Sequence, residues 1–252
     1  MTKFIYKFVL VLVRITSFIV VCPGFSYRGL SNIFKVSLSM VLSFLIINTV
    51  SDMEVYENIY YLFFMAIEEA LLGLAMGYIT KLVFAVIEIA GQMVDFQVGF
   101  SMASIYDPAM GINASNYGRV YYWLSICIFL ILDLHHRVLW SMINSFKVIP
   151  IGNVRFIGGV TEGVVKIFAL SFELALNLAA PLIIVVLITD IVLGVISKTV
   201  PQINVLMLGI PFKTMISFFT TLIMLSWLIG RMGKIISLTP NYLEDFLKLF
   251  IN

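Results

Sequence analysis

Charged residues are scarce in this chain. Only 12% of its 252 residues are Asp, Glu, Lys or Arg, whereas 61% are hydrophobic. Soluble domains carry about twice that share of charge, so the composition predicts a protein of a membrane system. The 16 basic and 14 acidic residues form no basic block and no acidic tail. This pattern argues against a nucleic-acid partner.

Cysteine, histidine and catalytic motifs are also rare or missing. Cys22 and Cys127 lie in apolar segments without a CxxC spacing, so we expect buried thiols and no disulfide framework. His135 and His136 are adjacent and cannot share a helix face as metal ligands four residues apart do. The chain has no Gly-rich nucleotide loop, no GxSxG and no HExxH. We therefore expect no enzyme, no cofactor and no metal.

The long apolar runs lack the alternation that is typical of β-strands, so the expected fold is all-α. At this length the chain can form one large domain or two small ones, and we expect a single helical domain over residues 1–252. The apolar regions are 4–22, 33–51, 58–90, 119–146, 163–198 and 203–230.

Several features divide or shape these regions. Region 58–90 is too long for one plain membrane span, so it must tilt, bend or break. We expect Pro181 to kink a helix that continues, and Pro201 and Pro211 to interrupt the last third of the chain. Residues of about 239–251 are expected to form a short amphipathic helix that docks on a partner or lies at the membrane interface.

Ionisable side chains interrupt the apolar regions so often that no charge-free stretch reaches the roughly 20 residues of a membrane helix. Each charge held in hydrocarbon costs a few kcal/mol, so we expect these helices to pack mostly against protein. Glu68 and Glu69 are expected to pair with Lys81 or with a partner chain. The alternative explanation of such charges is that long side chains near helix ends extend to the membrane interface, which suits Lys198 and, less well, Lys213 but does not explain Glu68 and Glu69. The charges expected to be buried are Arg14, Glu68, Glu69, Lys81, Glu88, Glu173 and Asp190.

Small residues line one face of region 58–90. Ala66, Ala70, Gly73 and Gly77 follow a 4-3-4 spacing, the pattern by which membrane helices approach closely. Gly91 is fourteen residues beyond Gly77 and is expected to extend the same close contact.

The central stretch, residues 88–119, separates two strongly apolar regions and is itself rich in Gly, Asn, Asp, Gln and Ser. A helix is plausible from Gly91 to Ser104, and the helical pattern stops at Tyr106. Asp107 precedes a proline, which disfavours helix there. A polar, turn-prone segment must satisfy its backbone groups against protein or in water. It therefore either lines or blocks a pore, or forms a solvated connection, and physics alone does not choose between them.

Three segments resemble one protein family, in order along the chain. AGQMVDFQVGFSMASIYDP, LWSMINSFKVIPIG and SKTVPQINVLMLGIPFK are similar to the signature segments of the FliR family, the T component of the type III secretion export gate. Arg14, Pro23 and Lys35 match its R…P…K pattern near the N-terminus. The motif residues are Gln92, Gln97, Gly99, Phe100, Pro150, Pro201, Gln202, Pro211 and Lys213.

The sequence departs from the family at one turn. The family usually has Asn-Gly-His before its fifth apolar region, whereas this chain has Asp133-Leu134-His135-His136. Leu134 does not easily adopt a Gly-type conformation, so a tight turn at this point is in doubt.

The resemblance implies an architecture and a set of partners. FliR-like proteins assemble with FliP-like and FliQ-like subunits into a channel of stacked helical hairpins in the bacterial inner membrane, within the flagellar basal body. FlhB-like and FlhA-like proteins are further expected partners, and unfolded polypeptides are the cargo. The flagellar system is favoured over an injectisome, which stays open. A small-solute secondary transporter with broken helices is the alternative.

The resemblance also implies a role for the central segment. In the family, a loop of the FliR-like subunit helps to plug the closed channel, and by position that loop corresponds to about residues 105–118. Soft Met and Tyr side chains suit a seal that can move aside. The expected plug residues are Met102, Tyr106, Asp107, Pro108, Met110, Gly111, Asn113 and Tyr117.

Overall fold

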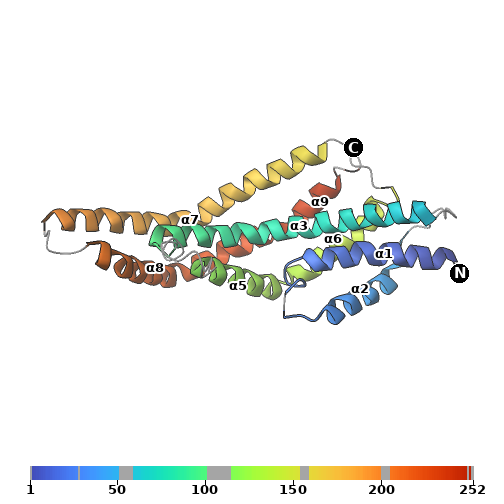
Figure 1. Ribbon diagram of the computed structural model, residues 1–252, viewed down its shortest axis with the longest axis horizontal. Coiled ribbons are helices and arrows are strands. Elements are labelled where there is room, and N and C mark those ends of the chain that lie inside the picture. Colours follow the sequence, from blue (N-terminus) through green and yellow to red (C-terminus); the bar gives the residue numbers. More distant parts are fainter. Residues whose placement is uncertain are drawn as a thin grey trace. The chain divides into compact units, whose positions relative to one another are not determined.

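A computed structural model describes residues 2–27, 29–50, 59–100, 115–153, 159–199, 205–248 and 250. This part of the chain contains helices and turns but no strand, so the all-α prediction is confirmed (Figure 1). The helices are α1 (Thr2–Val21), α2 (Asn32–Ile46), α3 (Ile59–Val98), α5 (Asn116–Ile131), α6 (Leu134–Val148), α7 (Gly159–Thr199), α8 (Val205–Ile236) and α9 (Thr239–Lys248).

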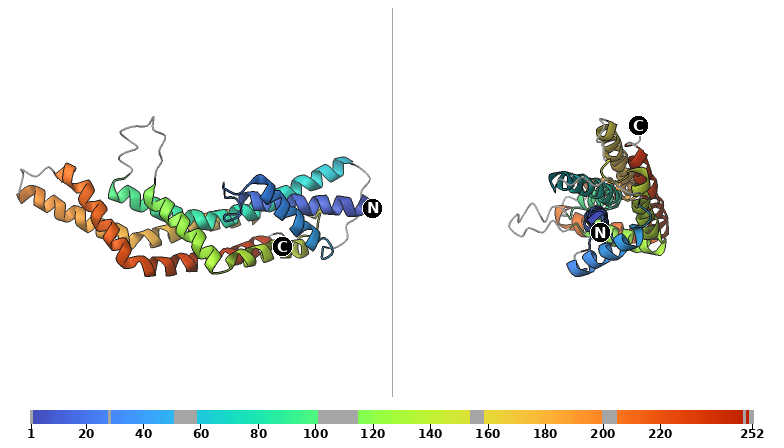
Figure 2. Two further views of the ribbon diagram at one scale, coloured as in Figure 1. Left: turned by 90° about the horizontal axis from the view of Figure 1, so that it is seen from below. Right: turned by 90° about the vertical axis from the view of Figure 1, so that its right-hand side faces the viewer.

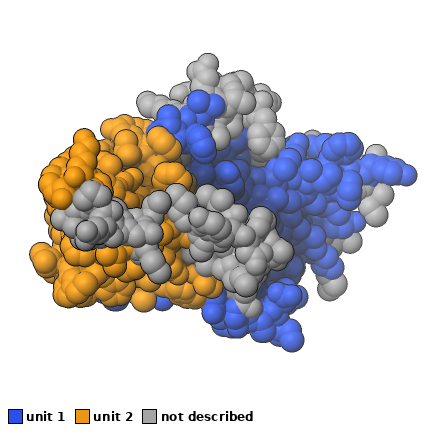
Figure 3. Space-filling model, turned by 60° about the vertical axis from the view of Figure 1, so that its left-hand side comes forward, with its two compact units in different colours: residues 1–83, 129–169, 236–252 blue, residues 84–128, 170–235 orange. Residues whose placement is uncertain are grey.

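The chain divides into two compact units, which Figure 3 colours separately. Unit 1 comprises Met1–Val83, Phe129–Ala169 and Ile236–Asn252, and unit 2 comprises Phe84–Ile128 and Leu170–Ile235. Several long helices therefore contribute residues to both units.

Unit 1 has a core of large apolar side chains that includes Phe18 on α1, Leu72 on α3 and Phe146 on α6. α1 packs against α2, and α6 packs against α9. Helix α9 is the short amphipathic helix expected at the C-terminus, and it buries Leu243 and Phe246 among other residues. Its apolar face is therefore used within this chain.

Glycines end three of the helical segments. α1 stops before the Cys22-Pro23-Gly24 turn, in which Gly24 has φ +88°, and α3 stops before Gly99, with φ +104°. The turn after α6 contains Gly152, with φ +75°. Residues with a Cβ rarely adopt this left-handed backbone, so these glycines fix where the chain changes direction.

The turn between α5 and α6 forms without a glycine, contrary to the doubt raised by the sequence. The left-handed residue is Asp133, with φ +54°, and Leu134 begins α6. Asp tolerates this conformation better than most residues because its short polar side chain can bond locally. The turn therefore shifts one residue towards the N-terminus and does not need a Gly-like residue at position 134.

Prolines break fewer helices than the sequence suggests. α7 continues through Pro181, as predicted, but α8 also continues through Pro211, so the predicted interruption there is wrong. A proline removes one backbone donor, and in apolar surroundings neighbouring groups can compensate for that loss. Pro201 lies outside the described residues.

The two cysteines differ in burial. Cys22 is buried at the end of α1, as predicted, whereas Cys127 on α5 is exposed, so the expectation of a buried thiol is wrong there. An apolar segment does not imply burial within the same chain, because one face of a long apolar helix can remain uncovered.

Four of the described helical segments are long and apolar enough to cross a membrane, or five if the broken pair α5–α6 counts as one span. α3 is one unbroken helix of 40 residues. Of the tilt, bend or break that the sequence suggested for region 58–90, the break therefore does not occur. At 1.5 Å per residue the length of α3 is about 60 Å, roughly twice the thickness of the bilayer hydrocarbon. Part of α3 must therefore lie beyond the hydrocarbon if it spans a membrane.

Candidate functional site

We use central segment for residues 101–114, between the described residues Phe100 and Ser115. The candidate site is the base of this segment, where α3 ends and α5 begins. The expected plug residues Met102, Tyr106, Asp107, Pro108, Met110, Gly111 and Asn113 lie outside the described residues. The chain is described up to Phe100 and again from Ser115. Both flanks belong to unit 2, and the end of α3 and the start of α5 lie side by side in Figures 1 and 2.

Asp95 terminates α3 through its backbone carbonyl. This oxygen accepts the N–H groups of Gly99, at 3.1 Å, and Phe100, at 3.0 Å. With the positive φ of Gly99, the two bonds close the helix and satisfy a carbonyl that would otherwise lack a partner. The last described residues before the central segment are thus held to Asp95.

The carboxylate of the same residue caps the start of α5. Asp95 Oδ1 accepts the N–H of Tyr117 at 3.1 Å, and Oδ2 accepts the N–H of Gly118 at 3.3 Å and the hydroxyl of Ser115. Ser115 Oγ itself accepts the Gly118 N–H at 2.9 Å. Helix N-termini carry free donors and a partial positive charge, so a carboxylate is well suited to this position. Asp95 is only 2% exposed.

Gly91 brings α3 and α5 into very close contact. A Cβ at Gly91 would lie 2.5 Å from the Gly118 nitrogen and 2.6 Å from its Cα. These are backbone atoms, so no side-chain rotation can make room. Gly91 therefore contacts α5, whereas Gly73 and Gly77 approach α1 in unit 1. The expectation that Gly91 extends the same contact is wrong, because it faces a different helix.

The sequence predicts that Tyr117 belongs to an irregular loop, and this prediction is wrong. Tyr117 lies in the first turn of α5. The predicted segment of 105–118 therefore extends at least three residues too far. The Tyr117 side chain is 6% exposed, and its hydroxyl lies 2.9 Å from Ser217 Oγ on α8. Its ring meets Tyr121 edge to face at 6.1 Å. This side chain holds α5 against α8.

A second polar connection in unit 2 joins two of the family motifs. Lys213 on α8 forms an ion pair with Asp190 on α7, and Gln97 Nε2 on α3 donates to Asp190 Oδ2 at 3.2 Å. The alternative explanation, in which Lys213 extends to the membrane interface, therefore does not apply to this residue. Its amino group finds a carboxylate on the neighbouring helix, which offsets part of the cost of removing either charge from water.

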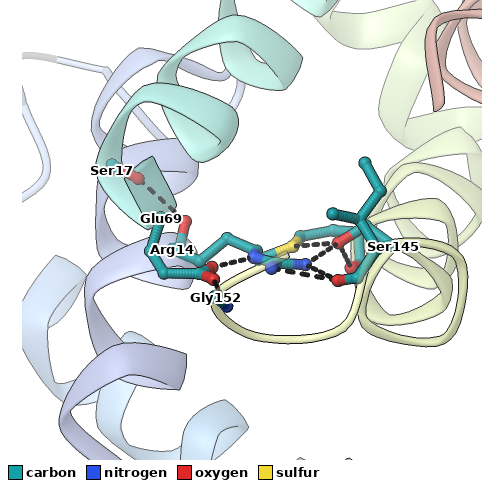
Figure 4. Close-up of polar contacts among 7 residues, drawn as sticks. Arg14, Ser17, Glu69, Ser145 and Gly152 are labelled. Atoms are coloured by element: carbon teal, nitrogen blue, oxygen red, sulfur yellow. Dashed lines mark hydrogen bonds and ion pairs between the residues drawn. The ribbon is translucent and has the colours of Figure 1, made fainter. Parts of the chain in front are cut away.

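Unit 1 contains a completely buried ion pair between Arg14 and Glu69 (Figure 4). The Arg14 guanidinium also donates to Ser145 Oγ at 3.2 Å and, through both terminal nitrogens, to the Ile149 carbonyl at 3.1 Å. Glu69 Oε1 accepts the Gly152 N–H at 3.2 Å. These contacts, which we call the Arg14 cluster, join α1, α3 and the end of α6 with its following turn.

The other charges expected to be buried are less enclosed within this chain. Lys81 and Glu173 are exposed, while Glu68 and Glu88 are partly exposed. The suggested pairing of Glu69 with Lys81 is also wrong. The two residues are twelve apart on α3, which places them about 120° apart around the helix, so only Glu69 faces α1.

The remaining predicted residues have varied positions. Ala66 and Ala70 are half-buried, Gln92 is exposed, and Pro211 is exposed within α8. Pro150 lies in the turn after α6, where its carbonyl accepts the Asn153 N–H at 3.1 Å. Pro201 and Gln202 lie outside the described residues.

Sequence reasoning missed Asp95, Ser115, Ser145 and Ser217. Ser115 could have been found, because a serine three residues before Gly118 at the start of an apolar run is a helix N-cap signal. Asp95 sits inside the quoted motif, but its role depends on which helix lies beside it. That information requires the fold.

Among the described residues, one group has the composition of a metal site. Ligand atoms of Asp133, His135 and His136 lie within 4.8 Å of one another. Asp133 and His136 are exposed, their side chains lie 3.8 Å apart, and all three residues lie at the N-terminal end of α6. Exposed groups of this kind are common without a metal, so no metal role follows.

Comparison with known proteins places this architecture in a family. The family described as "Bacterial export proteins, family 1" matches residues 5–239. The chain is 29% identical to the flagellar biosynthetic protein FliR of Bacillus subtilis, over 96% of this chain and 95% of that protein. It is 28% identical to FliR of Aquifex aeolicus, over 98% of this chain and 93% of that protein.

A relative with another name matches a shorter stretch. The surface presentation of antigens protein SpaR of Shigella sonnei is 27% identical over 66% of this chain and 62% of its own length. The resemblance seen in the three sequence motifs is thus confirmed across nearly the whole chain. The chain belongs to the bacterial export proteins, family 1, the family of FliR.

Proposed function

We propose that this chain is a non-enzymatic, pore-forming subunit of a type III protein-export gate in the bacterial inner membrane. In this role it passes unfolded flagellar proteins, and its central segment helps to seal the channel when no substrate is present. Membership of a bacterial export family over residues 5–239 supports the export role. The names of the FliR relatives favour the flagellar system.

The base of the central segment is the observation that carries the sealing role. The described chain stops at Phe100, just after α3, and resumes at Ser115, just before α5, and hydrogen bonds tie both points to Asp95. The residues between them include Gly111, Asn113 and the Asp107-Pro108 pair. A polar insertion that starts and ends at one point of an apolar helical unit is suited to project into a water-filled channel.

The exposed surface of the long helices supports assembly with partners. Only 22% of the most apolar 18 residues within Phe168–Thr199, on α7, and 11% of those within Leu208–Lys248, on α8 and α9, are buried within the chain. Glu173 is exposed on α7 and Lys81 on α3, and charges of this kind are costly against lipid. FliP-like and FliQ-like subunits, with FlhB-like and FlhA-like proteins, are the partners that the family resemblance implies.

Replacing residues 103–113 with a short Gly-Ser linker tests the sealing role, since it leaves α5 and its cap intact. In cells that make the complete export complex, we expect ions to leak across the inner membrane, measured as loss of membrane potential. The matched control replaces residues 52–57, between α2 and α3, with the same linker and leaves the potential unchanged. An intact potential in the first variant, with normal complex levels, would contradict the sealing role.

Purification separates an export-gate subunit from a small-solute transporter. An export-gate subunit should copurify with several other helical membrane proteins after mild detergent extraction. A transporter should be isolated alone and should bind or move a solute by itself. Recovery of a stable, active monomer would overturn the proposal.

A further inference from the structure

We infer that Asp95 is a positioning residue, whose side chain anchors the return point of the central segment beside its departure point. The inference rests on the proposed sealing role and assigns part of it to a residue outside the segment itself. Asp95 lies in the last turn of α3, five residues before Phe100, and faces the first turn of α5.

Five hydrogen bonds converge on this one residue. Its carbonyl receives two backbone N–H groups from the side where the chain departs, those of Gly99 and Phe100. Its carboxylate receives the Ser115 hydroxyl and the N–H groups of Tyr117 and Gly118 from the side where the chain returns. The two backbone bonds would form with any residue at position 95, so the side-chain bonds at the point of return are the ones specific to Asp95.

The chemistry of the α5 terminus requires a carboxylate at this position. All three groups that bond the Asp95 side chain are donors, so the side chain must offer acceptors only. Asparagine would present an amide NH2 to at least one of them and would lose the negative charge that favours a helix N-terminus. None of the three donors carries a formal charge, so the partial positive charge of the α5 terminus is what balances the carboxylate.

In the described part of the chain, few other acceptors are available to the N–H groups that the Asp95 carboxylate caps. Gly118 N–H can still bond Ser115 Oγ if Asp95 is lost, but no other acceptor for the Tyr117 N–H occurs among the described residues. A buried donor without an acceptor is costly, and loss of a helix cap raises the population of an opened first turn about five-fold. The return point of the central segment then loses its fixed position relative to the departure point.

The first test measures the anchor directly. Within the purified export complex, amide hydrogen exchange at Tyr117 and Gly118 should be about five-fold faster in D95A than in the wild type. D95N should give an intermediate rate, and S115A a smaller change because the carboxylate stays in place. S31A is the matched control: Ser31 Oγ caps α2 by accepting the Phe34 N–H at 3.2 Å, far along the chain from Asp95.

The second test measures function. D95A should increase ion leak across the inner membrane at normal complex levels, and S31A should not. If Asp95 acts through the central segment, combining D95A with replacement of residues 103–113 gives no more leak than the replacement alone. If Asp95 instead had a purely structural role, the combined variant would leak more than the variant with the replacement alone. If D95A fails to assemble, D95N provides the same comparison with nearly the same side-chain volume.

The outcomes separate this inference from the proposed function. A leak after replacement of 103–113 but none in D95A or D95N overturns the positioning role and leaves the sealing role standing. No leak after the replacement overturns the sealing role, and the inference falls with it. Exchange at Tyr117 and Gly118 that is unchanged in D95A overturns the anchor itself, whatever the leak assays show.

Discussion

The two units solve the problem of a buried charge in different ways. In unit 1, Arg14 and Glu69 neutralise each other, and their remaining bonds reach two further points of the chain. In unit 2, Asp95 is nearly as buried, but it is satisfied by backbone donors and a hydroxyl. The Arg14 cluster joins α1 and α3 to the end of α6, whereas Asp95 joins the end of α3 to the start of α5.

This difference predicts different consequences of mutation. Removing one partner of a buried ion pair leaves an uncompensated charge in an apolar core. Removing the Asp95 side chain leaves the Tyr117 N–H without its acceptor, and an unpaired N–H costs less than an unpaired charge. The Arg14 cluster should therefore govern whether unit 1 folds, and Asp95 should govern how precisely one segment is held.

The largest effect is expected from R14A. It leaves Glu69 buried without its cation, so unit 1 should lose about 3–5 kcal/mol of stability. R14M/E69M should be less damaging than R14A, because the double change removes both charges and keeps much of the side-chain volume. Thermal unfolding of the purified complex measures the stability of R14A and of R14M/E69M. K81A, at an exposed position, is the control. A melting temperature of R14A equal to that of K81A would refute the comparison.

The next effect concerns the close helix contacts, which exist in both units. G73A and G91A each bring a Cβ into overlap with backbone atoms of the neighbouring helix, so the helices must separate, at a cost of about 1–3 kcal/mol. G230A is the matched control because nothing lies within 4 Å of its Cβ. It should be neutral or stabilise the helix by about 0.5–1 kcal/mol. Equal melting temperatures for all three variants would contradict this account.

A smaller effect is expected from Y117F. The change removes one hydrogen bond to Ser217, whose hydroxyl still bonds the Thr214 carbonyl. The loss should be about 0.5–1.5 kcal/mol in thermal unfolding. Y78F, at an exposed position of α3, serves as the control. A loss of stability in Y117F as large as that in R14A would contradict this estimate.

The smallest effect is expected from D190N in the detergent-solubilised protein. The side chains of Lys213 and Asp190 are 21% and 35% exposed, so solvent screens the pair and its loss should cost about 1 kcal/mol or less. Thermal unfolding, with K213M as the reciprocal variant, checks this value. A loss as large as that of R14A would contradict the argument that solvent screens this pair.

The sequence is most informative where apolar runs, prolines and glycines determine local structure. It predicts the all-α fold and a first apolar region that stops at residue 22, next to the end of α1 at Val21, because these features act within a few residues. It does not predict the left-handed Asp133 or the continuity of α8 through Pro211. The first is one of several residues near this turn that could have taken the left-handed conformation, and the second depends on the surroundings of α8 and not on the proline alone.

Interaction partners are harder to predict than the presence of charges. The charge pattern indicates that Arg14 and Glu69 need protein partners, but it cannot identify them as each other, because they are 55 residues apart. Asp95 gives no signal of its own, since a single acidic residue near a helix end is ordinary. Its role is visible only once α5 lies beside α3.

The Arg14 cluster also constrains how the chain can be made. Arg14 leaves the ribosome early, whereas Glu69 follows 55 residues later and Ser145 131 residues later. At typical translation rates these gaps correspond to about 3–11 s and 7–26 s. During that interval the guanidinium must stay hydrated or be sheltered by the insertion machinery. The first helix can therefore settle into its final environment only after more than half of the polypeptide has been synthesised.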